Sequence, residues 1–242
     1  MPKLFLTSSP FAAPGAPLNG KNCFAVRFAA CVRGMRRALF ITSDPAHVRF
    51  TKSFSDAVRL TMELTGIRFP DYTILDGRNR ERAAELVQSA ELIILAGGHV
   101  PTQNAFFSEI GLRAMMRQFD GTVLGISAGS MNAADIVYAQ PEEEGEAVDP
   151  AYQRFLTGLD LTKTMLIPHY QAIRDDMLDG MRIVADITCP DSFGRRFIAL
   201  CDGSYLYADS GCERIFGEAY LIQDGVIRQL SADADDPEGV LL

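Results

Sequence analysis

The sequence predicts an α/β fold in which a mostly parallel sheet is covered by helices on both faces. Short apolar segments alternate with helical segments over roughly the first half of the chain. This alternation requires right-handed crossover connections, and such connections place helices on both sides of a parallel sheet. Near the C-terminus the pattern changes to short apolar runs separated by glycines such as Gly203, Gly211 and Gly225, which predicts antiparallel strands.

In the first half of the chain, the apolar runs rich in branched residues are expected to form five strands. These strands cover residues 3–8, 37–43, 72–75, 92–96 and 122–124. The segments between them have apolar residues at helical spacing or are charged, and several end at a glycine. The expected helices cover residues 22–33, 50–65, 78–88 and 101–119, and a further short helix covers 130–134.

In the second half, residues 141–150 (PEEEGEAVDP) form an acidic, turn-rich insert that is expected to be a surface loop at the rim of a site. A strand is expected at 165–168 and a helix at 176–187. Further strands are expected at residues 197–202, 204–208, 214–222 and 226–230. The acidic residues 231–242 are expected to fray. Without repeats or an obvious linker, residues 1–242 are expected to form a single domain.

Composition limits the classes of partner. The 242 residues carry a net charge of −8, which argues against nucleic acid and anionic membranes. The longest apolar runs are too short to span a bilayer. The five cysteines lack C-x-x-C spacing, so free thiols in a cytoplasmic protein are expected, without a metal or cofactor. The expected assembly is a monomer or homodimer.

The functional prediction rests mainly on residues 122–133, which read TVLGISAGSMNA. A buried strand, a G-x-S-x-G turn and a helix follow one another, as in a nucleophile elbow. The small residues Gly125, Ala128 and Gly129 would allow Ser127 to occupy a strained turn, with the amides of the following helix aimed at an oxyanion. The alternative is an ordinary strand-to-helix turn in which small residues only permit close packing.

A serine nucleophile needs a general base, and the chain contains three histidines. His47 lies in a turn-like DPAH stretch and is expected on the surface. His99 follows Gly97-Gly98 and is a competitor. His169 follows an apolar strand and Pro168, and it is the favoured base because a strand end would deliver it to the site.

Asp202 is the favoured orienting acid because it follows an apolar strand and precedes Gly203. The same pair could be a plain Asp-Gly turn. Four residues of the acidic insert are rival acids: Glu142, Glu143, Glu144 and Asp149. The chain order Ser, His, Asp differs from that of α/β-hydrolases, so the elbow does not indicate that fold.

The amides of Ala128 and Gly98 are the expected oxyanion donors, because a glycine pair at a neighbouring strand end lets the backbone approach closely. The pair Gly97-Gly98 could instead form only a helix-entry turn. A phosphate-binding loop is less favoured, because neither G-x-x-x-x-G-K nor G-x-G-x-x-G follows a strand.

Together these motifs resemble the peptidase E and cyanophycinase family of serine peptidases, whose fold is similar to that of class I glutamine amidotransferases. The matching segments are residues 93–98, 125–130, 168–170 and 200–203. The resemblance implies a three-layer α/β/α, flavodoxin-like domain, a triad of Ser127, His169 and an acid, and an oxyanion hole at Gly98 and Ala128. It implies a small-peptide substrate, such as a dipeptide with an N-terminal aspartate.

The chain departs from the family pattern at two places. Asp202 stands where aspartyl dipeptidase has a glutamate, and His99 follows the glycine pair in place of the usual Asn or Asp, so substrate contacts near His99 are expected to differ. Arg174 is the candidate partner for a substrate carboxylate; a solvated arginine at a helix start is the alternative. The other functional hypotheses are a non-catalytic small-molecule binding protein and an amidotransferase-like amide hydrolase.

Overall fold

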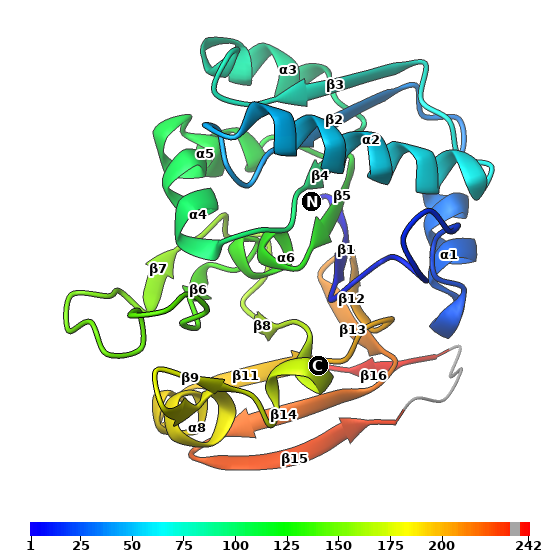
Figure 1. Ribbon diagram of the computed structural model, residues 1–242. Helices are drawn as coiled ribbons and strands as arrows, with labels where there is room; N and C mark the ends of the chain where they lie inside the picture. Colours follow the sequence, from blue (N-terminus) through cyan, green and yellow to red (C-terminus); the bar gives the residue numbers. More distant parts are fainter. Residues whose placement is uncertain (233–237) are drawn as a thin grey trace.

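The computed structural model describes residues 1–232 and 238–242, and a large sheet runs through its centre (Figure 1). Within the described residues this sheet has eight strands in the order β16-β13-β12-β1-β5-β4-β2-β3. The five strands from β1 to β3 in this order are parallel, as predicted. They are β1 (Lys3–Thr7), β5 (Thr122–Ile126), β4 (Leu92–Leu95), β2 (Arg37–Ile41) and β3 (Asp71–Leu75). The antiparallel strands are β12 (Tyr205–Asp209), β13 (Cys212–Phe216) and β16 (Val240–Leu241).

Helices cover both faces of this sheet, which confirms the predicted three-layer architecture. Alternate strand residues face opposite sides: Phe5 packs with α1 (Phe24–Cys31) and α2 (Val48–Leu64). Its neighbours Leu4 and Leu6 pack in the core on the other side. That second core is covered by α3 (Ala83–Ser89), α4 (Val100–Glu109) and α5 (Leu112–Met116).

A smaller sheet lies below the large one in Figure 1 and supplies part of the site. Its strand order is β15-β14-β11-β8, and β8 and β11 are parallel neighbours. The strands are β8 (Met165–Ile167), β11 (Arg196–Leu200), β14 (Ala219–Gln223) and β15 (Val226–Ser231). Leu166 and Ile198 belong to the same core cluster as Leu4 and Leu6, so the two sheets are joined by shared apolar packing.

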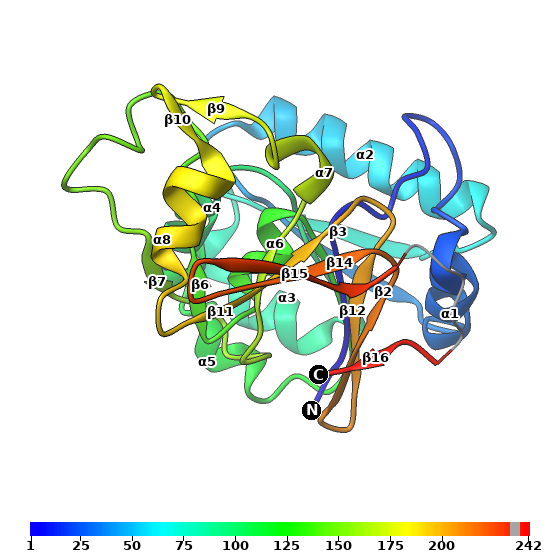
Figure 2. The same cartoon turned by 90° about the horizontal axis from the view of Figure 1, so that it is seen from below.

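The prediction of a helix over residues 176–187 is wrong for the first half of that segment. A hairpin of β9 (Met177–Leu178) and β10 (Met181–Arg182) forms there. Asp179 and Gly180 both have positive φ, at 51° and 80°, which suits a two-residue hairpin turn and not a helix. A π-helical segment, η3 (Ile183–Thr188), and α8 (Cys189–Asp191) follow. The hairpin and α8 lie on the opposite side of the molecule from α1 (Figures 1 and 2).

Other differences come from turns that the hydrophobic pattern did not reveal. The helix expected at 101–119 is divided into α4 and α5 at Gly111, whose φ is 68°. The strand expected at 214–222 is two strands, β13 and β14, which turn at Gly217 and enter different sheets. Strands β6 (Ile136–Tyr138) and β7 (Phe155–Thr157) flank the acidic insert and were not predicted. In the C-terminal stretch expected to fray, Val240 and Leu241 form β16; residues 233–237 lie outside the described residues.

Candidate active site

Ser127 occupies a sharp turn between β5 and α6 (Ala128–Asn132), with φ 49° and ψ −112°. A positive φ at a residue with a side chain is uncommon and costs about 1–3 kcal/mol, so surrounding contacts must hold it. The Ser127 amide donates to the carbonyl of Thr7 at 3.1 Å, and the Ser130 hydroxyl donates to the same carbonyl at 2.8 Å. The end of β1 therefore braces the turn.

Neither Gly125 nor Gly129 of the pentapeptide has room for a side chain. A Cβ at Gly125 would lie 2.9 Å from the backbone nitrogen of Ser130. A Cβ at Gly129 would overlap the carbonyl of Leu95 and lie 2.7 Å from its Cβ. The motif is thus spaced so that α6 can begin directly against β4 and β5.

We expect Gly129→Ala to destabilise the protein and displace the turn at Ser127. Overpacking costs about 1–3 kcal/mol, and each kcal/mol lowers Tm by about 2–4 °C in a domain of this size. Gly20→Ala is the matched control, because Gly20 has φ −81° and no atom lies within 4 Å of the added Cβ. Equal Tm values for the two variants, measured by thermal unfolding, would contradict this account of Gly129.

His169 supplies the imidazole that meets the Ser127 hydroxyl. It lies immediately before α7 (Tyr170–Ile173) in the left-handed region, with φ 58°. Its Nε2 is 2.9 Å from Ser127 Oγ, and its Nδ1 is 2.7 Å from Asp202 Oδ1. His169 follows β8 and Asp202 follows β11, and because these strands are parallel neighbours their carboxyl ends bring both side chains together.

The Asp202 carboxylate is held by three side chains. Its Oδ1 accepts a hydrogen bond from Ser8 Oγ at 2.6 Å in addition to the contact with His169, and its Oδ2 accepts one from Gln171 Nε2 at 2.6 Å. Burial alone raises the pKa of Asp202, but the bonds from His169, Ser8 and Gln171 outweigh burial and hold this pKa below the ordinary 3.8. The carboxylate therefore stabilises the fold above pH 3.8, and this contribution is lost as pH falls through the lowered pKa.

Ser8 is a residue of this site that the sequence analysis missed. It is fully buried, and its hydroxyl also accepts a hydrogen bond from the His169 amide at 2.8 Å. It follows β1, which is the parallel neighbour of β5, with Thr7 opposite Ile126. Its place one residue beyond a strand end was the available signal, because neighbouring parallel strands end at the same edge.

We expect Ser8→Ala to lower kcat by about 10- to 100-fold with little change in KM. A hydrogen bond to a charged group contributes about 1.5–3 kcal/mol, and each 1.36 kcal/mol of barrier is about tenfold in rate. The control is Ser9→Ala, because the Ser9 hydroxyl accepts a 3.4 Å bond from the Phe11 amide and does not touch Asp202 or His169. Steady-state kinetics of both variants measure the effect, and a normal kcat in Ser8→Ala would remove Ser8 from the site.

Of the predicted oxyanion donors, Ala128 directly follows Ser127 in the chain and Gly98 lines the same cavity as Ser127. Ala128 is the first residue of α6, where helix amides lack a carbonyl from a preceding turn. Gly98 has φ 151°, lines the same cavity as Ser127, and has no room for a Cβ because Ser43 Oγ occupies that space. The backbone of these two residues can therefore approach a substrate carbonyl from two strand ends.

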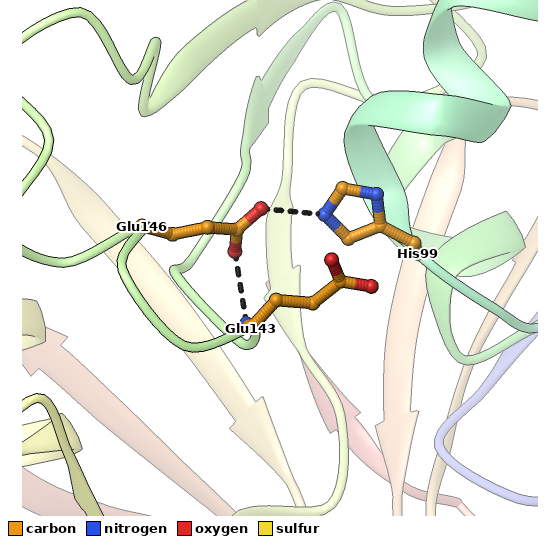
Figure 3. A group of neighbouring side chains, drawn as sticks. All are labelled: His99, Glu143 and Glu146. Atoms are coloured by element: carbon orange, nitrogen blue, oxygen red, sulfur yellow. Dashed lines mark hydrogen bonds and ion pairs between the residues drawn. The ribbon is translucent and has the colours of Figure 1, made fainter.

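The rival histidines are engaged elsewhere. His99 Nδ1 is 2.8 Å from Thr102 Oγ1, and His99 Nε2 is 2.8 Å from Glu146 Oε1. Figure 3 shows the His99 ring beside the carboxylates of Glu146 and Glu143 of the acidic insert, with Glu146 bonded to the ring. His47 is exposed and pairs with Asp44.

The group of His99, Glu143 and Glu146 is the place where the described residues could hold a metal ion. One ligand atom from each residue lies within 4.8 Å of the others. His99 already contacts Glu146, and Glu146 Oε2 also accepts the amides of Glu142 and Glu143 at 2.9 and 3.0 Å. These contacts fasten the insert to the start of α4.

Arg174, the predicted carboxylate partner, lies at the end of α7 with about half of its side chain exposed. Its Nε is 2.9 Å from Asp175 Oδ2, and it is not among the residues that line the cavity at Ser127. The geometry therefore matches the alternative that the sequence left open, a solvated arginine.

A cavity of about 170 Å³ opens beside Ser127 and His169. Apolar side chains such as Val100, Met131 and Ile183 form much of its wall, and Gln140, Glu142 and Asp176 supply polar groups. Glu142 belongs to the acidic insert, so this loop reaches the rim of the site. No helix in residues 1–232 or 238–242 has the length and apolar character needed to cross a membrane.

Comparison with known proteins identifies a family and several related solved structures. The model of peptidase family S51 matches residues 29–210, which is most of the chain. A 1.5 Å crystal structure of a Listeria monocytogenes EGD-e protein assigned as a peptidase E has 14% identity and a TM-score of 0.59, covering 96% of this chain and 100% of that chain. At 14% identity this structural similarity shows that the two proteins share a fold, and it shows nothing further. No curated protein is significantly similar to the sequence.

Proposed function

The chain belongs to peptidase family S51 and is a serine-type peptidase, and we propose that Ser127, His169 and Asp202 form its catalytic triad. The observation that supports this most strongly is the unbroken series of hydrogen bonds. Ser127 Oγ is 2.9 Å from His169 Nε2, and His169 Nδ1 is 2.7 Å from Asp202 Oδ1. These distances lie in the range required for proton transfer between a nucleophile and its base.

In this mechanism His169 takes the proton of Ser127 as Oγ attacks the peptide carbonyl. Asp202 holds the imidazole in the tautomer with its proton on Nδ1 and stabilises the imidazolium that forms. The amides of Gly98 and Ala128 donate to the tetrahedral oxyanion. The imidazolium then protonates the leaving amine, and water hydrolyses the acyl-enzyme by the same route.

The proposed substrates are short peptides. The cavity has a volume of about 170 Å³, whereas pockets that enclose drug-sized ligands measure about 300–1,000 Å³. The acidic insert contributes Glu142 to the rim of this cavity. The preference for an N-terminal aspartate, implied by the family resemblance, stays a prediction; no lysine or arginine is among the residues that line the cavity. The free thiols of all five cysteines favour the reducing cytoplasm as the place of action.

The direct test combines covalent labelling with hydrolysis. The purified protein is treated with a fluorophosphonate probe, and the labelled peptide is identified by mass spectrometry. A panel of dipeptides and tripeptides is then assayed with and without labelling. We expect an adduct on Ser127 and loss of hydrolysis in proportion to labelling. An unlabelled Ser127, or full peptidase activity after complete labelling, would overturn the proposed triad.

A further inference from the structure

The charge of the cavity beside Ser127 has one sign. Glu142 and Asp176 line it, and no lysine or arginine is among its lining residues. His169 also lines it, but both of its ring nitrogens are engaged with Ser127 and Asp202. A carboxylate entering this cavity would meet two like charges, whereas a cation would meet two opposite charges.

The two acidic groups of the cavity each accept one backbone amide among the described residues. Val100 donates to Glu142 Oε1 at 3.1 Å, and Met177 donates to Asp176 Oδ1 at 2.9 Å. By contrast, Glu146, which is not among the lining residues, contacts His99 and accepts two backbone amides. Glu142 is exposed, yet desolvation by its neighbours raises its pKa above the ordinary 4.5. The Val100 amide and nearby His99 oppose this rise, and Glu146 and Glu143 add to it.

Glu142 is held by the loop that also carries Gly98, one of the proposed oxyanion donors. The amide that holds it belongs to Val100, two residues after Gly98, and both Val100 and Gly98 line the cavity with Ser127. One loop therefore presents both the proposed oxyanion donor and the anchor of the carboxylate. A cation bound by Glu142 would fix the register of the peptide relative to Ser127.

We propose that Glu142, with Asp176, makes the cavity selective for substrates that present a positively charged group next to the cleaved bond. This inference rests on the proposed peptidase function and names its substrate class. The cation has two possible sources, the free N-terminal ammonium or a lysine or arginine side chain, and the substrates below separate them. An N-terminal acidic side chain is disfavoured by the same charges.

The test measures kcat/KM of the full-length protein on four matched peptide substrates. One has a free N-terminus and neutral side chains, one is the same peptide N-acetylated, one is N-acetylated with lysine before the cleaved bond, and one has a free N-terminus and aspartate before the cleaved bond. We expect kcat/KM for the free-ammonium or the lysine substrate to be about 10- to 100-fold higher than for the neutral acetylated substrate. This is the factor expected from one hydrogen bond to a charged group. Whichever cationic substrate is preferred identifies the source.

The matched variants are Glu142→Gln and Glu144→Gln. Glu144 is exposed in the same insert and is not among the lining residues, so its variant controls for the loss of one negative charge. We expect Glu142→Gln to abolish most of the preference, mainly by raising KM for the cationic substrate, whereas Glu144→Gln is expected to keep both the preference and the activity on the neutral acetylated substrate.

Equal rates on cationic and neutral substrates, faster cleavage of the aspartate substrate, or an unchanged preference in Glu142→Gln would overturn the inference. If Ser127 is labelled by the fluorophosphonate probe and the neutral peptide is cleaved, the proposed function stands in each of these cases. If no substrate is cleaved and Ser127 is not labelled, the proposed function and the inference both fail.

Discussion

Ser127→Ala is expected to lower kcat by about 10⁴- to 10⁶-fold, because the variant has no nucleophile to form an acyl-enzyme. A small residual rate from oxyanion donors and substrate positioning is expected to remain. Alanine at this position keeps the Cβ and the backbone amide that donates to Thr7 at 3.1 Å, so folding is expected to be preserved. Steady-state kinetics with the best peptide substrate measure the effect.

The control for Ser127→Ala is Ser53→Ala, which removes an exposed hydroxyl on α2. It should retain full activity and the same thermal unfolding curve. A Ser127→Ala protein that folds normally and still hydrolyses peptides within tenfold of the original rate would exclude Ser127 as the nucleophile.

His169→Gln is expected to lower kcat by a comparable factor, about 10⁴- to 10⁶-fold, because no other imidazole contacts Ser127 Oγ within the described chain. The glutamine can fill the space and accept a hydrogen bond, but it cannot take a proton at neutral pH. Labelling of Ser127 by the fluorophosphonate probe should slow in parallel, since it requires the same activation.

The histidine comparison uses two further variants. His47→Gln changes an exposed residue paired with Asp44 and should leave activity unchanged. His99→Gln removes contacts with Thr102 and Glu146 and should cost far less than His169→Gln, because neither His99 nitrogen contacts Ser127. If His99→Gln were the inactive variant and His169→Gln the active one, the proposed base would be wrong.

The nucleophile turn was predictable because its requirements are local. A buried strand, small residues at Gly125 and Gly129, and a following helix are all within ten residues of Ser127, and the structure shows that neither glycine has room for a Cβ. The alternation of apolar and helical segments likewise predicted the parallel strands and the layers, because each helix must return the chain to the next strand. Asp179-Gly180 carried an equally local signal for a hairpin, which the helical pattern around it obscured.

The small sheet could not be predicted in the same way. Apolar runs at 165–168 and 197–202 indicate strands but contain no information on which sheet they join. In the structure β8 pairs with β11 and β11 pairs with β14, so these strands form a separate sheet instead of extending the large one. The site therefore forms where the carboxyl ends of strands from two sheets meet, with β1 and β5 on one side and β8 and β11 on the other.

The sequence by itself determined that a serine stands on a strained turn, that the fold has parallel strands between helices, and that a few histidines and acids were candidate partners. Only the tertiary structure decided that His169 and not His99 meets Ser127, that Asp202 and not the acidic insert holds the imidazole, and that Ser8 joins them. The reason is physical: turn geometry depends on neighbours along the chain, whereas a hydrogen bond between residues 42 or 194 positions apart depends on how strands pair.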